Sequence, residues 1–248
     1  MDMYNYFVAH VEPGLKVSPS KVFYELKRWV SEASGKIDRC GGMRGNIIKY
    51  NEKKYVDELI SGKREIISLY SERIWEKGDW SEGLICDFSA TYTSTEGIIL
   101  SARGESMEVR ELVDAFFEMI SIFGFFDYAY SYCETHAYGS GYAAGVFTPD
   151  DDHPFMWPRR SEVRRWWNKQ WDGLSDLFIR DVYPVNIFSD RKLSALPPEK
   201  RLALESALKR FGVCDTRGKF TVWALDDDEL EAARAELKSV ELVASYCP

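Results

Sequence analysis

Lysine and arginine are absent from the 48 residues between Arg110 and Arg159, although the whole chain contains 32 of them. This stretch, from Glu111 to Pro158, holds eight carboxylates and thirteen Phe, Tyr or Trp residues. A surface without cations cannot neutralise phosphate groups, but it can dock against a positively charged protein. The absence of cations therefore favours a negative and aromatic surface that binds a protein partner.

Cysteine and histidine are also scarce, with five and three residues in the chain. The cysteines form no CxxC pair and no Cys/His ligand spacing, so the sequence indicates neither a zinc site nor a disulfide framework. No run of 18 apolar residues occurs, and the first residues lack the basic and apolar regions of a secretory signal. We therefore expect a reduced, cytoplasmic protein.

The negative charge is spread evenly along the chain. The net charge is −8, and residues 1–124 and 125–248 each contain 16 basic and 20 acidic residues. The acidity thus belongs to the folded body rather than to a tail. Nucleic acid and anionic membranes, which are themselves negative, are not expected as direct partners.

The sequence contains no recognisable catalytic set. Ser140 lies in Gly-Ser-Gly, which lacks the spacing of a nucleophile elbow, and no Gly-Lys-Ser/Thr phosphate loop occurs. Glu134 and His136 could ligate a metal from one strand face, and the run Asp150–Asp152 could contribute to it. A metal-dependent hydrolase built on these residues is one alternative, although the run lacks the pattern of a calcium loop. We expect no enzyme activity, no cofactor and no bound metal.

Hydrophobic periodicity predicts helices and strands joined in part by hairpins. Apolar residues at helical spacing predict helices over residues 19–34, 52–60, 108–123, 198–211 and 226–238, with a further helix capped by Ser161. Strands are predicted over residues 4–11, 65–71, 83–92, 97–102 and 125–134, with a final hairpin at 213–225. Glycines make residues 139–145 a predicted loop. We expect an α+β fold, with helices packed against a mainly antiparallel sheet, in a single domain over residues 1–248. Residues 159–248 are the candidate for a second lobe.

Aromatic residues are grouped at two places. In the predicted strand 125–134, the rings of Phe126, Tyr128, Tyr130 and Tyr132 share one face, which would line a second layer or a groove. Trp166 and Trp167 are adjacent and point different ways on a helix, so one is expected to be buried and the other partly exposed.

The partner is expected to contact the acidic run and the aromatic residues beside it. Consecutive aspartates at a turn-rich segment raise the local negative potential. Exposed Trp and Tyr are the types most enriched in interface hot spots. The predicted contacts are Asp150, Asp151, Asp152 and Trp157, supported by Tyr138 and Tyr142.

Several short segments resemble one bacterial family. They are the strand Tyr4-Asn5-Tyr6-Phe7-Val8, the stretch Arg180-Asp181-Val182-Tyr183-Pro184-Val185-Asn186-Ile187-Phe188-Ser189 with Leu193, and Val222-Trp223 in the terminal hairpin. In this order, around an acidic and aromatic middle, they resemble the immunity protein 52 family. That family is encoded beside toxins with restriction-endonuclease-like nuclease domains, including type VI secretion effectors.

The resemblance implies that the chain neutralises a cognate antibacterial toxin, and it supplies no catalytic residues. A nuclease presents cations to phosphate, so a negative inhibitor gains association rate and specificity against it. The sequence hypothesis is therefore an immunity protein that binds a nuclease toxin. A non-catalytic subunit of another complex is the remaining alternative.

Overall fold

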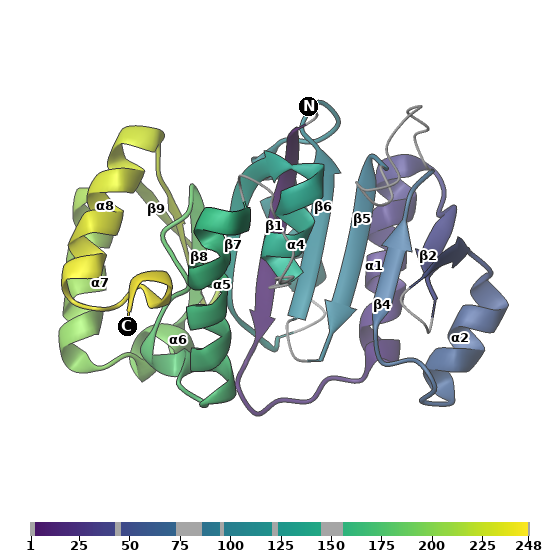
Figure 1. The fold of residues 1–248 in the computed structure, drawn as a ribbon, viewed down its shortest axis with the longest axis horizontal. Helices are drawn as coiled ribbons and strands as arrows, with labels where there is room; N and C mark the ends of the chain where they lie inside the picture. The colour runs from purple at the N-terminus through teal and green to yellow at the C-terminus, as the bar shows by residue number, and fades with distance from the viewer. Residues whose placement is uncertain are drawn as a thin grey trace. The chain divides into compact units, whose positions relative to one another are not determined.

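The computed structural model describes residues 3–42, 46–72, 86–94, 97–120, 124–144 and 156–247. Its contacts divide the chain into two compact units (Figure 1). The N-terminal unit contains residues 1–125 and 133–140, and the C-terminal unit contains residues 126–132 and 141–248. The second unit thus includes more of the chain than the expected lobe after residue 158.

The N-terminal unit is built on a sheet of six strands in the order β3-β2-β4-β5-β6-β1. The strands are β1 (Met3–Val11), β2 (Arg39–Gly41), β3 (Ile47–Lys49), β4 (Ile67–Tyr70), β5 (Phe88–Thr93) and β6 (Gly97–Arg103). Every ladder between them is antiparallel, and β5 and β6, which match two of the predicted strands, form a hairpin with Phe88 opposite Ala102.

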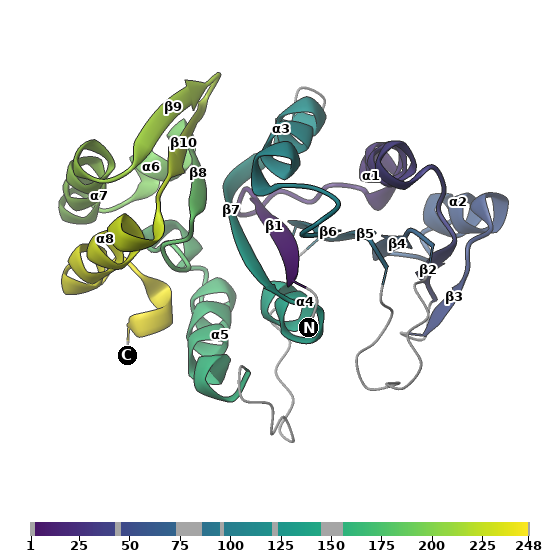
Figure 2. The same cartoon turned by 90° about the horizontal axis from the view of Figure 1, so that it is seen from above.

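Helices α1 (Pro19–Ser34) and α3 (Val109–Ile120) lie on one face of this sheet (Figure 2). Val22, Leu26 and Val30 of α1 are fully buried, as their spacing of four residues predicts. The helix ends at Gly35, whose φ of 78° is the left-handed conformation that glycine adopts without strain. Helix α2 (Glu52–Ile60) begins after Asn51, whose side chain accepts a hydrogen bond from the Lys54 nitrogen.

The C-terminal unit has a four-stranded sheet in the order β7-β8-β10-β9. Its strands are β7 (Phe126–Thr135), which contributes residues 126–132 to this unit, β8 (Val185–Ser189), β9 (Val213–Arg217) and β10 (Phe220–Ala224), and its ladders are antiparallel. Its helices are α5 (Met156–Trp171), α6 (Asp190–Ala195), α7 (Pro198–Arg210) and α8 (Asp227–Ser239), with short 3-10 turns η2 (Ser175–Leu177) and η3 (Ala244–Tyr246). The predicted α+β class with a mainly antiparallel sheet is confirmed.

Two local predictions were wrong. Residues 136–144 form helix α4 (His136–Ala144) rather than a loop, although the segment contains two glycines. A Cβ atom on Gly139 would lie 2.0 Å from the Tyr6 ring, so the glycine allows this helix to approach β1 closely. Helix α5 also begins at Met156, so Ser161 lies inside the helix instead of capping it. None of the described helices is long and apolar enough to cross a membrane.

Candidate functional site

The described part of the segment without lysine or arginine begins with an acidic face on α3. Glu111, Asp114 and Glu118 stand at positions i, i+3 and i+7, so they follow one another along one side of the helix. Glu111 and Glu118 are exposed, whereas Asp114 is half-buried. The ring of Phe117 is half-buried beside them. We call these four residues the acidic α3 face.

The opposite side of α3 holds the helix on the sheet. Leu112 and Phe116 are fully buried, and the Phe116 ring lies 4.4 Å from the ring of Phe7 in β1. At the start of the helix, the Glu111 side chain accepts a hydrogen bond from the Glu108 nitrogen at 2.8 Å. This bond satisfies one of the amides that a helix leaves unpaired at its N-terminus. Because the apolar side of α3 packs on the sheet, the orientation of the helix is set, and with it the side on which the carboxylates lie.

The rings of β7 pack under a second layer, which was one of the two expectations for this face; the other expectation, a groove, was wrong. Phe126, Tyr128, Tyr130 and Tyr132 are between 0% and 6% exposed, so they form core rather than a docking face. Ala129, which points to the other side of the strand, is buried too. When both faces of a strand are covered, all of its side chains are buried, polar and aromatic ones alike. These four rings are therefore not available to bind a partner protein.

A buried arginine accounts for several of the tyrosines. Arg180 is 1% exposed, and its Nη1 donates to the Tyr130 hydroxyl while its Nη2 donates to the Tyr142 carbonyl at 2.5 Å. The hydroxyls of Tyr142 and Tyr183 are 2.9 Å apart, and the Tyr130 and Tyr183 rings stack at 4.1 Å. We call Arg180, Tyr130, Tyr142 and Tyr183 the Arg180 cluster. Its neutral oxygens and ring faces hold the cation by hydrogen bonds and cation–π contact.

Carboxylates border this cluster on α5 and on the chain before β8. Asp181 accepts hydrogen bonds from the Val182 nitrogen at 2.7 Å and from Arg234 Nε of α8 at 3.0 Å. Burial raises the pKa of Asp181 despite the attraction of Arg234, and burial with repulsion by Asp181 raises the pKa of Glu162. Burial likewise raises the pKa of Tyr130 and of Tyr142. These shifts follow from packing inside the C-terminal unit and need no ligand.

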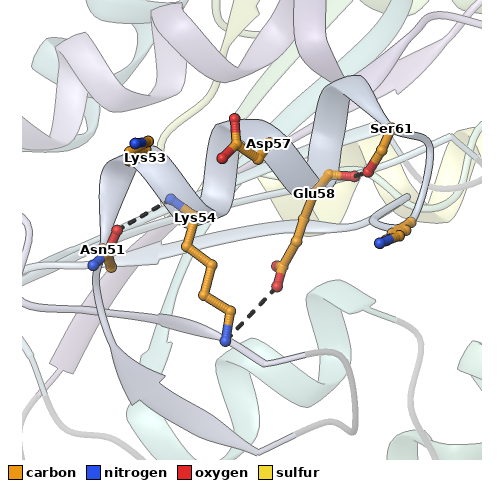
Figure 3. A pocket seen from close by; sticks show the side chains of 7 residues that line it. Asn51, Lys53, Lys54, Asp57, Glu58 and Ser61 are labelled. Atoms are coloured by element: carbon orange, nitrogen blue, oxygen red, sulfur yellow. Dashed lines mark hydrogen bonds and ion pairs between the residues drawn. The ribbon is translucent and has the colours of Figure 1, made fainter.

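A shallow pocket of about 360 Å³ lies along α2 (Figure 3). One carboxylate oxygen of Glu58 in this pocket is 3.9 Å from the Lys54 ammonium, and the other is 2.6 Å from Arg64 Nη2. The pocket is lined by Asn51, Lys53, Lys54, Asp57, Glu58, Ser61 and Lys63. Its lining residues include no nucleophile paired with a base, and its principal carboxylate is already bound by two cations. We assign no chemistry to it.

A neighbouring pocket of about 410 Å³ contains the Cys40 thiol. Burial raises the pKa of this thiol, so it is protonated at neutral pH and is a poor nucleophile.

Glu134 and His136, the metal ligands of the alternative hydrolase, have other neighbours in the structure. A Glu134 oxygen accepts from the Thr135 nitrogen at 2.8 Å, and the His136 ring lies 4.8 Å from the Tyr4 ring. Over the described ranges, no group of three His, Cys, Asp or Glu residues is placed to hold a metal ion. The aspartates that would complete the alternative hydrolase site lie outside those ranges.

Three of the six predicted partner contacts lie in the part of the chain that the structure describes. Asp150, Asp151 and Asp152 lie outside the described residues, Tyr138 belongs to α4, and Trp157 belongs to the first turn of α5. Tyr142 is 1% exposed and bonded within the Arg180 cluster, so its ring is part of the core rather than of a surface. The prediction that Tyr142 contacts a partner is therefore wrong, because its side chain packs inside the C-terminal unit.

Sequence reasoning did not identify the Arg180 cluster or the acidic α3 face as units. The sequence marks Arg180 only as the first residue of the stretch that resembles the immunity protein 52 family, since nothing in a sequence shows that an arginine is buried. The spacing of Glu111, Asp114 and Glu118 was visible in the sequence, and a helical projection of the outer side of α3 would have found it.

No protein-family model matches the chain, and neither does any curated protein or solved structure.

Proposed function

We propose that this chain is an immunity protein that binds and neutralises a cognate antibacterial toxin, a nuclease effector of a type VI secretion system. One observation carries the proposal. The 48-residue segment without lysine or arginine begins on the exposed side of α3, where Glu111, Asp114 and Glu118 form one negative row. The segment resemblance to the immunity protein 52 family points to the same role.

The physical basis is charge complementarity. A nuclease must present cations where it binds phosphate, and a row of carboxylates attracts such a surface before contact. Opposite charges on the two proteins raise the association rate and disfavour wrong partners. The dissociation rate depends mainly on how well the side chains pack in the complex. The half-buried ring of Phe117 is an apolar contact within reach of the same face. The chain acts by occupying the toxin and performs no reaction of its own.

Co-expression with the product of the neighbouring gene tests the proposal. We expect the two proteins to co-purify in a fixed ratio, and we expect added chain to abolish the toxin's nuclease activity at that same ratio. A neighbouring gene product that neither binds nor is inhibited would contradict the proposal. So would a chain that purifies with a metal and a hydrolytic activity that His136→Ala removes, because that is the behaviour of the alternative enzyme.

A further inference from the structure

Helix α5 ends with a tryptophan that the C-terminal unit leaves uncovered. Trp171 is 74% exposed, the largest value for any large apolar side chain in the described ranges. One turn earlier, the Trp167 ring is half-buried and lies 5.6 Å from the Trp171 ring. Trp166 is 4% exposed and belongs to the core, so the expectation that adjacent tryptophans point different ways is confirmed. Exposed paired tryptophans are typical of binding surfaces.

Two arginines continue the same side of α5 toward its N-terminus. Arg160, Arg164, Trp167 and Trp171 stand at positions i, i+4, i+7 and i+11, so they form one straight row, which we call the α5 stripe. Arg164 is exposed, whereas Val163 beside it is fully buried and faces inward. One half of the stripe is therefore cationic and the other half is aromatic.

A surface of this kind is complementary to itself. We infer that the α5 stripe binds the α5 stripe of a second copy of this chain, with the two helices antiparallel about a two-fold axis between residues 167 and 168. In that register Arg164 lies against Trp171 of the partner subunit, and the symmetry repeats the contact. A guanidinium over an indole face is a favourable cation–π pair, and the face of tryptophan is the strongest aromatic acceptor.

Charge selects this arrangement over the others. Asp172, which is exposed and follows Trp171 directly, comes near Arg164 of the partner subunit in the antiparallel register and adds an opposite charge. Parallel helices would instead place Arg164 against Arg164 of the partner subunit, where like charges repel. Phosphate-bearing partners are disfavoured because the chain carries a net charge of −8.

Sedimentation across a concentration series tests the inference on the full chain. A single helix pair buries less area than a standard stable interface, so we expect a reversible dimer with a dissociation constant on the order of 10–100 μM. Trp171→Ala and Arg164→Glu should each raise that constant by about ten-fold or more, since central Trp and Arg contacts dominate small interfaces. Leu202→Ala is the matched control, because Leu202 is 63% exposed on α7 and should leave the dimer unchanged.

A charge swap tests the register. The double variant Arg164→Glu with Asp172→Arg should recover at least part of the affinity that Arg164→Glu loses, because the two positions meet across the axis. A chain that stays monomeric up to about 500 μM would overturn the inference, since that limit exceeds the constant expected for so small an interface. A dimer that neither Trp171→Ala nor Arg164→Glu weakens would also overturn the inference. So would a monomer whose tryptophan fluorescence changes on adding anionic vesicles, if Trp171→Ala removes that change. Unchanged thermal unfolding of the variants shows that they are folded.

Discussion

Arg180 caps the last turn of α4 through Tyr142. The Arg180 Nη2 donates to the Tyr142 carbonyl at 2.5 Å, and the guanidinium carbon lies 4.1 Å from the centre of the Tyr142 ring. A helix leaves its last carbonyls without partners and favours positive charge at that end. One buried cation therefore satisfies a carbonyl and packs on the ring of the same residue. This contact stabilises a helix that contains two glycines.

Replacing Arg180 with lysine should destabilise the protein while keeping the charge. Lysine retains the cation but lacks the planar fork that reaches both Tyr130 and the Tyr142 carbonyl, so one buried acceptor loses its partner. We expect the free energy of unfolding to fall by about 2 kcal/mol, measured by urea denaturation. Arg164→Lys, at an exposed position, is the control and should change stability by less than about 0.5 kcal/mol. Equal stability of the two variants would contradict the capping role.

Tyr142→Phe should separate packing from partner binding. The change removes one hydroxyl from the Tyr142–Tyr183 hydrogen bond and leaves the ring in place. We expect a loss of about 1 kcal/mol in the free energy of unfolding, with the affinity for the toxin unchanged. Calorimetry and a binding titration measure the two effects. A large loss of affinity without a loss of stability would show that Tyr142 contacts the toxin directly.

Lys192 should make stability increase with pH above pH 8. Its ammonium is buried and donates to the Phe178 carbonyl at 2.7 Å. Burial lowers its pKa to about 8 against the attraction of Asp127 and Asp176. Below pH 8 both the folded and the unfolded chain hold the proton. Between pH 8 and the ordinary lysine pKa near 10.4, this lysine binds more protons in the unfolded chain, so its contribution to stability rises with pH.

The slope due to this lysine approaches about 1.4 kcal/mol per pH unit in that window. Unfolding free energies at pH 7.5, 9 and 10 measure it, and Lys192→Met should remove the increase. Above about pH 10 the buried tyrosines act in the opposite direction. Burial raises the pKa of Tyr92 to about 12, so its contribution to stability is lost as pH rises toward that value. Burial also raises the pKa of the Cys86 thiol to about 12, which lowers stability as pH rises through the same window. The test is therefore the difference between the two proteins, and equal slopes between pH 8 and 10 for the wild type and Lys192→Met would show that Lys192 titrates normally.

Charge reversal on the acidic α3 face should slow the encounter with the toxin. In Asp114→Lys with Glu118→Lys, two carboxylates become cations while Glu111, which supports the helix start, is kept. We expect the association rate to fall by about ten-fold at low salt, and the difference to shrink as salt screens the charges. Stopped-flow fluorescence measures the rates. The control variant Glu32→Lys with Glu65→Lys changes the net charge by the same amount at two exposed positions elsewhere in the same unit. If both double variants lower the association rate equally, the effect is due to net charge and not to the acidic α3 face.

The aspartate run offers an independent prediction from the sequence. Asp151→Lys combined with Asp152→Lys should weaken binding mainly through the association rate, and more strongly at low salt. Surface plasmon resonance at two salt concentrations measures the rate constants. Unchanged binding of the toxin by this variant would remove these residues from the interface and leave the acidic α3 face, Trp157 and Tyr138 as the candidates.

Local signals explain why some elements were predicted correctly. The helix predicted over residues 52–60 is α2 (Glu52–Ile60), since its Asn51 cap and apolar spacing act within one or two turns. The hairpin of β9 and β10 turns at Gly218, whose φ is 61°, and Asp226 caps α8 by accepting from the Glu229 nitrogen at 3.0 Å. Each of these interactions joins residues that are close in the chain.

Distant contacts explain what was missed. Helix α4 depends on Tyr6, which lies 133 positions before Gly139, and on Arg180, which lies 38 positions after Tyr142. The rings of β7 looked available in the alternating pattern, but both faces of that strand are covered. Short strands such as β2 (Arg39–Gly41) and β3 (Ile47–Lys49) carry too few residues for a periodic signal.

The sequence by itself determined the fold class, most of the helices and hairpins, and the long segment without a cation, because these follow from composition and from contacts a few residues apart. Only the tertiary structure decided which rings are core, which arginine is buried, and which carboxylates and tryptophans face solvent. Burial is set by how distant segments cover one another, and the same tyrosine or arginine can be stable on a surface or inside, provided that its polar atoms find partners.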